Sequence, residues 1–335
     1  MMYYLHLAIA YLREKLDSIF RKKLVQAIAE YGEKWEIKAI NDFSSNICKT
    51  YPYIWTKFQV DTDTYCNREG KPDHRGIYTS KWLSPDTEEN YRQNGNKRFT
   101  ADEIIYKIDQ QGYRLYDFNL MNKPLAGKVL CFGCSNTLGI GLPDHDTWPY
   151  LLNHLLGMLK YNCINYGQNG GSIDMITRLI YSYLENNPKP KAIVCYFPDI
   201  FRIEYFSDQY NQPLRLAAER INPCTYNNHE SYRKFVTMEY AFFNFVKNFK
   251  FIETICKLHK VPFVWYTWSP TLLHFEGERL RNFLGYNGIY DLHTDKLFHI
   301  PELTRARDNM HFGNAHMRVL ARKFYEQLQT SKDFN

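Results

Sequence analysis

Three short polar segments carry the side chains that could do chemistry, and their residue types suit acyl transfer. Gly133–Gly139 follows an apolar run and contains Ser135, a serine positioned as an exposed nucleophile beside backbone amides. Asn165–Ser172 is rich in glycine, which lets the backbone approach a ligand closely. Asp308 and His311 lie three residues apart, a spacing that lets a carboxylate orient an imidazole.

Alternating apolar runs and helical patterns after residue 124 predict the elements that position these segments. Strands are predicted over 128–132, 162–166, 192–197 and 262–267, and helices over 148–159, 173–184, 231–259 and 313–329. Strands that alternate with helices of this length predict a parallel sheet with helices on both faces. Ligands bind at the C-terminal ends of the strands in such sheets, which is where the first two segments fall.

In this order and at these spacings, the segments resemble the motif blocks of the SGNH (GDSL-like) hydrolase family. The first block resembles Phe132–Gly139, with Cys134 in place of the block's Asp, as in a variant branch of the family. The second resembles the glycine pattern of Asn165–Gly170, and the last resembles Asp308–His311. The resemblance covers roughly residues 125–330. It implies a three-layer α/β/α, flavodoxin-like SGNH hydrolase fold with a parallel sheet.

The resemblance also implies a mechanism and a substrate class. Ser135 would be the nucleophile, His311 the general base that later acts as an acid, and Asp308 the group that holds the histidine tautomer. The backbone amides of Ser135 and Gly170 would bind the oxyanion. The expected activity is hydrolysis of a small acyl ester, such as an acetyl ester, of a carbohydrate or lipid-like alcohol. Acyl transfer to another alcohol would use the same residues, and no metal or cofactor is expected.

One position departs from the family pattern. The family places an oxyanion-binding Asn after the third strand, where this sequence has Pro198, which offers neither a side-chain donor nor an N–H. Losing one such donor typically costs ~2.7–4 kcal/mol of transition-state stabilisation. Asn136, Asn169 and Arg202 are candidate replacements and candidate substrate contacts. The alternative hypothesis is therefore a catalytically weak or inactive SGNH-like binding or structural module in a larger assembly.

Several candidate residues also have a purely structural interpretation. Ser135 could be an unreactive turn serine, His311 a surface histidine at a helix start, and Asp308 a capping residue. Arg202 could form an ordinary surface ion pair. His316, which follows on the last predicted helix, is expected to be a packing residue. The functional interpretation rests on the three segments occurring together.

The cysteines favour a reduced protein over a redox or zinc site. Cys131 and Cys134 form a C-x-x-C pair, but no second pair occurs at zinc-site spacing, and Cys131 lies within an apolar run. The eight cysteines are spread along the chain, and the N-terminus lacks the pattern of a signal peptide. The sequence therefore predicts a cytoplasmic or other non-secreted compartment.

The N-terminal part of the sequence predicts a separate extension. We assign residues 1–122 to a helical and irregular extension and 123–335 to the hydrolase-like domain. Apolar side chains between residues 3 and 31 recur at helical spacing, so one or two helices there would pack on their own domain, mediate self-association, bind a protein partner or lie on a membrane surface. Residues 66–99 are polar and turn-rich, which predicts irregular surface structure. The aromatic cluster around Trp55 would pack internally or stack sugars.

Composition excludes several classes of protein. The chain of 335 residues is 44% hydrophobic and 23% charged, as expected of a folded soluble protein. No apolar run approaches the ~18 residues that cross a bilayer. The net charge of +6 is not concentrated in a basic block, so nucleic acid is not an expected partner. A small-molecule or glycan ester is the expected ligand.

Overall fold

The computed structural model describes residues 72–120, 126–157, 160–206, 218–221, 238–268, 305–331 and 334. The helices predicted over residues 3–31 and the aromatic cluster around Trp55 lie outside the described residues. Within the ranges given, no helix is long and apolar enough to cross a membrane.

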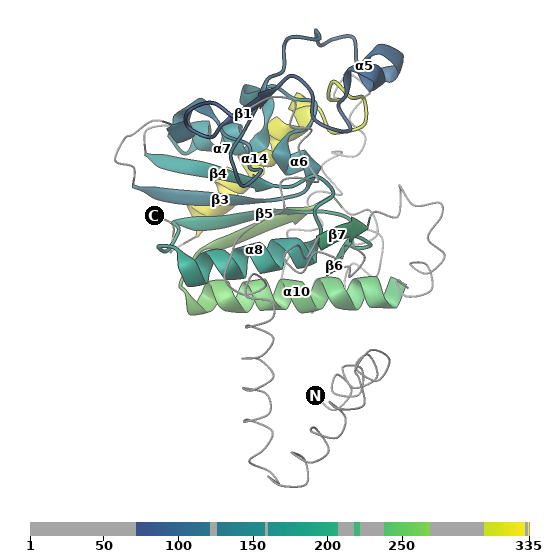
Figure 1. Ribbon diagram of the computed structural model, residues 1–335. Coiled ribbons are helices and arrows are strands. Elements are labelled where there is room, and N and C mark those ends of the chain that lie inside the picture. The colour runs from purple at the N-terminus through teal and green to yellow at the C-terminus, as the bar shows by residue number, and fades with distance from the viewer. Residues whose placement is uncertain are drawn as a thin grey trace, which may run out of the picture. The chain divides into compact units, whose positions relative to one another are not determined.

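A four-stranded parallel sheet forms the centre of this fold (Figure 1). Its strands run in the order β4-β3-β5-β8, with bounds Tyr161–Gly167, Gly127–Gly133, Ala192–Phe197 and Phe263–Thr267. The chain adds β4 on one side of β3 and β5 on the other, so the direction of winding reverses between β3 and β5. Such a reversal opens a crevice at the C-terminal ends of the strands. Ser135 lies two residues beyond the end of β3, at the C-terminal edge of the sheet.

Helices cover both faces of the sheet and complete the predicted three-layer α/β/α fold. Helix α7 packs against α14 on one face, and α8 packs against α10 on the other (Figure 1). Their bounds are Trp148–Leu155 for α7, Ile173–Asn186 for α8, Met238–Leu258 for α10 and Asn314–Thr330 for α14. The sequence prediction extended the first of these helices to residue 159. The helix stops earlier because Gly157 takes a left-handed conformation, with φ of 88°.

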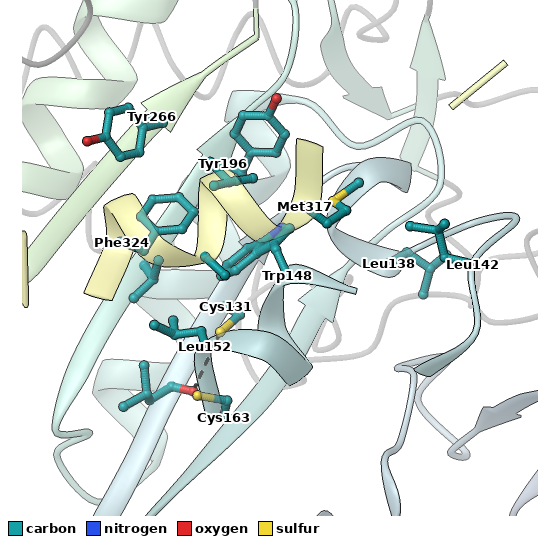
Figure 2. Close-up of a cluster of buried hydrophobic side chains, with 14 of the residues drawn as sticks. Cys131, Leu138, Leu142, Trp148, Leu152, Cys163, Tyr196, Tyr266, Met317 and Phe324 are labelled. Atoms are coloured by element: carbon teal, nitrogen blue, oxygen red, sulfur yellow. Dashed lines mark hydrogen bonds between the residues drawn. The ribbon is translucent and has the colours of Figure 1, made fainter. Parts of the chain in front are cut away.

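The core on the α7 and α14 side fixes the elements that flank the candidate site. Trp148 is fully buried, with its ring centroid 4.8 Å from that of Phe324 on α14, and Met317 lies in the same cluster (Figure 2). Burial of each such side chain stabilises the fold by ~1.5–3 kcal/mol. The indole Nε1 of Trp148 also donates to Thr137 Oγ1 at 3.2 Å. This core therefore holds both the start of α14 and the turn that carries Ser135.

Short elements from residues 72–120 belong to the same compact unit as the sheet. Strands β1 (Tyr78–Ser80) and β2 (Tyr106–Ile108) form an antiparallel pair, and α5 spans Glu88–Asn94. Irregular structure was predicted over much of this stretch. Helix α5 forms because Thr87 caps it by accepting from the Asn90 N–H, with two glutamates in the first turn.

The remaining described elements are short. They comprise the helix α6 (Ser135–Leu138), the 3-10 helices η3 (Asp117–Leu120) and η4 (Asp144–Asp146), and the antiparallel strands β6 (Ile203–Phe206) and β7 (Ala218–Ile221).

Candidate active site

Ser135 is the first residue of α6, which begins directly after β3, so the backbone turns sharply beneath its side chain. An exposed serine was predicted here, but the residue is only 4% exposed. The turn depends on Gly133, because a Cβ there would lie 2.0 Å from Thr137 Oγ1 and 2.8 Å from the Tyr196 carbonyl oxygen. A larger residue would push α6 away from the sheet. The glycine therefore sets how closely the serine approaches the strand ends.

The second polar segment packs directly against this serine turn. The Gln168 N–H donates to the Gly133 carbonyl at 3.1 Å. A Cβ on Gly167 would lie 2.2 Å from the Leu138 nitrogen, so only glycine lets α6 pack on the end of β4. Gly170 has φ of 63°, in the left-handed region that favours glycine. The sequence-predicted oxyanion donors thus occupy adjoining turns.

The two predicted oxyanion donors take no part in the hydrogen bonds of the described residues. Neither the Ser135 N–H nor the Gly170 N–H has a hydrogen-bond acceptor within the part of the chain that the structure describes. The first is expected, because the N–H groups of an opening helical turn have no intrahelical acceptor. Free N–H groups beside a nucleophile are the usual donors to a developing oxyanion.

Asn165 holds the serine turn and the glycine turn together. Its Nδ2 donates to the Thr137 carbonyl at 2.9 Å and to the Tyr116 hydroxyl at 2.8 Å, and its Oδ1 accepts from the Gly167 N–H at 2.8 Å. The side chain is fully buried. Its hydrogen bonds are therefore used to position backbone, and Tyr116 is a supporting residue that the sequence analysis missed.

Asp308 and His311 are brought together in the turn before α14. One carboxylate oxygen of Asp308 bonds the imidazole Nδ1 of His311, and the other accepts the N–H groups of Met310 at 3.0 Å and His311 at 3.1 Å. Asn309 allows this tight turn by taking φ of 58°, which asparagine tolerates. Bonded in this way, Nδ1 directs the opposite ring nitrogen, Nε2, away from the carboxylate.

The environment of Asp308 keeps it ionised. The residue is 1% exposed, and burial by itself raises the pKa of a carboxyl group. The hydrogen bond and positive charge of His311 and two backbone N–H groups outweigh burial, so the pKa of Asp308 lies below its ordinary value. An ionised carboxylate is what a histidine base needs, because it stabilises the imidazolium that forms.

The histidine turn contacts the serine turn at two points. The Phe312 N–H donates to Asn136 Oδ1 at 3.4 Å, so the residue after His311 meets the residue after Ser135. The Arg307 N–H donates to the Gly141 carbonyl at 2.8 Å. The structure thus brings the first and third polar segments into direct contact.

A buried ion pair anchors the histidine turn from behind. The Arg307 guanidinium bonds the carboxylate of Asp86, with Nη2 to Oδ2 at 2.6 Å, and both side chains are fully buried. The Tyr106 hydroxyl donates to the same carboxylate at 2.6 Å and accepts from the Gly141 N–H at 2.7 Å. Residues 72–120 therefore supply the support for a turn near the C-terminus.

A second buried arginine, Arg114, anchors the serine turn. Its Nη1 donates to the carbonyls of Leu138 and Gly139, and its Nη2 donates to that of Leu142 at 2.8 Å. Nε and Nη2 also bond Asp144 Oδ1, at 3.0 and 2.8 Å. The guanidinium thus fixes the path of the chain just after α6. Neither Arg114 nor the Asp86–Arg307 pair was among the predicted site residues.

The other predicted contacts lie around the edge of these turns. Asn169 Nδ2 donates to the Ser84 carbonyl at 2.8 Å, which directs this amide toward residues 72–120. Pro198 directly follows β5, and the Arg202 guanidinium carbon lies 5.0 Å from the ring centroid of Trp268. Arg202 thus lies beside the residue that directly follows β8.

Cys131, Cys134 and His316 are all buried, which fits a packing role. Cys131 and Cys134 are free and buried, and burial raises the pKa of the Cys131 thiol well above its usual value. No group of His, Cys, Asp or Glu suited to a metal ion occurs among the described residues. His316 is buried, with its ring stacked on Phe312 and its Nε2 3.0 Å from the Tyr196 hydroxyl.

Comparison with known proteins gives structural likenesses only. No protein-family model and no curated protein matches the sequence. A lipolytic protein of the G-D-S-L family from Veillonella parvula is 15% identical, with 61% of this chain and 99% of that chain covered and a TM-score of 0.38. An acetyl xylan esterase from Geobacillus stearothermophilus is 16% identical, with coverages of 62% and 96% and the same TM-score of 0.38. The functional assignment therefore rests on the geometry of this chain.

Proposed function

We propose that the chain is a serine ester hydrolase in which Ser135, His311 and Asp308 form a catalytic triad. The observation that carries the proposal is the ionised, buried Asp308 bonded to Nδ1 of His311, in a turn that contacts the serine turn. A carboxylate in this position fixes the tautomer that leaves Nε2 as the base. A surface or capping role for Asp308 would not require its burial against an imidazole.

The reaction would proceed through an acyl-enzyme. His311 accepts the Ser135 hydroxyl proton as Oγ attacks the ester carbonyl, and the resulting imidazolium protonates the alcohol as the C–O bond breaks. Water then attacks the acyl-serine, with His311 again taking the proton and returning it to Oγ. The products are a carboxylic acid and an alcohol. If an alcohol replaces water in the second step, the same residues carry out acyl transfer.

The amides of Ser135 and Gly170 would stabilise the oxyanion. Support comes from their positions in adjoining turns without other acceptors in the described region. Pro198 supplies no third donor, so we expect a slower enzyme than one with three. The proposed substrate is an ester of a small acyl group, with acetyl as the first to test, on a carbohydrate or lipid-like alcohol. The substrate would bind at the C-terminal ends of the strands, where parallel α/β sheets usually bind their ligands.

Labelling with a fluorophosphonate probe tests the proposal directly. The wild type should label, Ser135→Ala should not label, and His311→Ala should label much more slowly because the serine loses its base. Ser182→Ala on α8 and Cys134→Ala are matched controls that should keep labelling. Mass spectrometry should place the adduct on Ser135. An unlabelled, well-folded wild type, or an adduct that survives Ser135→Ala, would overturn the proposal.

The second candidate function is a binding or structural module with an inactive site. Pro198 is the specific observation in its favour, because it removes a donor of the SGNH-like pattern. This hypothesis predicts a folded wild type that neither labels nor hydrolyses para-nitrophenyl acetate faster than Ser135→Ala does. The labelling experiment therefore separates the two functions.

A further inference from the structure

Arg202 has a buried guanidinium without an anionic partner among the described residues, unlike Arg114 and Arg307. The residue is 8% exposed, and its Nε and Nη1 atoms are buried without a hydrogen-bond acceptor in that part of the chain. No ion pair links it to a carboxylate of the described residues. Burying a cation without a partner lowers stability. A buried set of donors without acceptors therefore points to a ligand that supplies the acceptors.

The side chain beside Arg202 adds to this site. Trp268 lies under the guanidinium, 5.0 Å from ring centroid to guanidinium carbon, and its indole Nε1 is also buried without an acceptor in the described part of the chain. The aromatic face holds the guanidinium in place through a cation–π contact. The planar fork of arginine matches two oxygens of a carboxylate or phosphate. The Arg202–Trp268 pair thus presents several donors suited to an oxyanion.

Trp268 lies near the residue that adjoins the proposed base His311. Trp268 directly follows β8, and neighbouring strands are about 4.8 Å apart, so this edge is about 10 Å from the end of β3, near Ser135. The Trp268 ring contacts that of Phe312, with centroids 6.4 Å apart, and Phe312 adjoins the base His311. The base protonates the departing alcohol, so the alcohol part of an ester would extend toward Trp268.

We propose that Arg202 and Trp268 form a subsite for an anionic group, a carboxylate or a phosphate, on the alcohol part of the ester substrate. This inference rests on the proposed hydrolase function and names its substrate class. The anion would satisfy the orphaned guanidinium and hold the ester several bonds away over Ser135. Charge-assisted hydrogen bonds of this kind are about twice as strong as neutral ones.

Matched substrates test the subsite through a ratio of rates. We would measure kcat/KM for para-acetoxybenzoate, its neutral methyl ester and para-acetoxyphenyl phosphate. The wild type should prefer an anionic substrate, and Arg202→Gln should lower that preference by about 10- to 100-fold, mainly through KM. Arg202→Lys should restore part of it. Arg322→Gln, which removes the same charge from the exposed face of α14, should keep the wild-type preference.

Two outcomes separate this inference from the proposed function. If the wild type hydrolyses the neutral ester and the preference is unchanged in Arg202→Gln and Arg202→Lys, the subsite is wrong and the hydrolase stands. Calorimetry with Ser135→Ala and para-acetoxybenzoate measures binding without turnover. Binding that is lost on adding Arg202→Gln supports the subsite even if the wild type hydrolyses nothing. The preferred anion distinguishes a carboxylate from a phosphate ligand.

Discussion

The serine turn and the histidine turn are each held by a buried arginine, but the two arginines work differently. Arg114 reaches from residues 72–120 into the serine turn and bonds three backbone carbonyls, with Asp144 as a partner whose side chain is 22% exposed. Arg307 reaches in the opposite direction, from the histidine turn to Asp86, and both members of that pair are fully buried. The interactions of Arg114 hold the backbone after α6 in position. The Arg307–Asp86 ion pair is buried, so water cannot solvate either charge if its partner is removed.

This difference predicts that losing the arginine interaction destabilises the two turns to different extents. A buried charge that loses its partner is left without solvation, whereas the partly exposed carboxylate of Asp144 can regain water. We therefore expect the histidine turn to depend on its arginine more strongly than the serine turn does. The following substitutions test that order.

Asp86→Ala should have the largest effect. It leaves the Arg307 guanidinium buried and unpaired, and the free energy of unfolding should fall by about 3–5 kcal/mol. Urea denaturation measures the loss. Asp102→Ala is the matched control, because its ion pair with Lys81 is exposed and should contribute about 0–1 kcal/mol. Equal losses in the two variants would contradict the role of the buried pair.

Arg114→Met should cost less, about 2 kcal/mol, because the charged partner that it leaves behind, Asp144, is partly exposed and can be hydrated. Labelling of Ser135 should slow because the chain after α6 loses its support. Lys107→Met, which removes an exposed ion pair with Asp117, provides the control and should label normally. A loss of stability greater than that of Asp86→Ala would reverse the comparison.

Gly141→Ala tests the contact between the two turns. Gly141 has φ of 74°, and an added Cβ would lie 2.9 Å from Ala306 Cβ and 3.0 Å from the Arg307 nitrogen. The left-handed backbone alone costs about 1–2 kcal/mol, and the crowding adds to it. Gly157→Ala has a similar φ of 88°, but its nearest new contact is 3.7 Å away. Labelling should fall for Gly141→Ala only, and equal labelling would argue against coupling of the turns.

The smallest expected effect is a pH dependence that involves Asp308. Because its folded-state pKa is below the ordinary value of 3.8, its ionisation stabilises the fold above that pH. That contribution is lost as the pH falls through the lowered pKa. The stability difference between the wild type and Asp308→Asn should therefore shrink on acidification from about pH 5 to about pH 2. Chemical denaturation at several pH values measures this stability difference. A difference that grows on acidification would contradict a lowered pKa for Asp308.

The sequence predicted the sheet and the helices around it with good accuracy. Strand β5 was predicted with its observed bounds, and the strand predicted over 128–132 is β3, one residue longer at each end. Buried strands are recognisable because they are continuous apolar runs. The three polar segments were also identified from the sequence, because their residue types and spacings form local patterns. The parallel sheet brings the strand ends that precede the first two segments to one edge.

The support of the site could not be predicted in the same way. Asp86 and Arg307 are 221 residues apart, and each has the sequence surroundings of an ordinary surface charge. Arg114 contacts carbonyls, which every residue has, so no pattern marks its partners. Thr87 followed by two glutamates was a usable signal for the start of α5. This polar network joins residues that are far apart in the sequence. It therefore produces no periodic sequence pattern from which it could be predicted.

The Asp86–Arg307 pair also sets an order of events during protein synthesis. Asp86 leaves the ribosome long before its partner, and at about 5–20 residues per second the delay is about 10–40 s. Once the serine turn has been synthesised, the nascent chain still lacks both the proposed base and the cation that neutralises Asp86. The candidate site is therefore completed only after synthesis has reached the segment before α14, and the proposed nucleophile would lack its base until then.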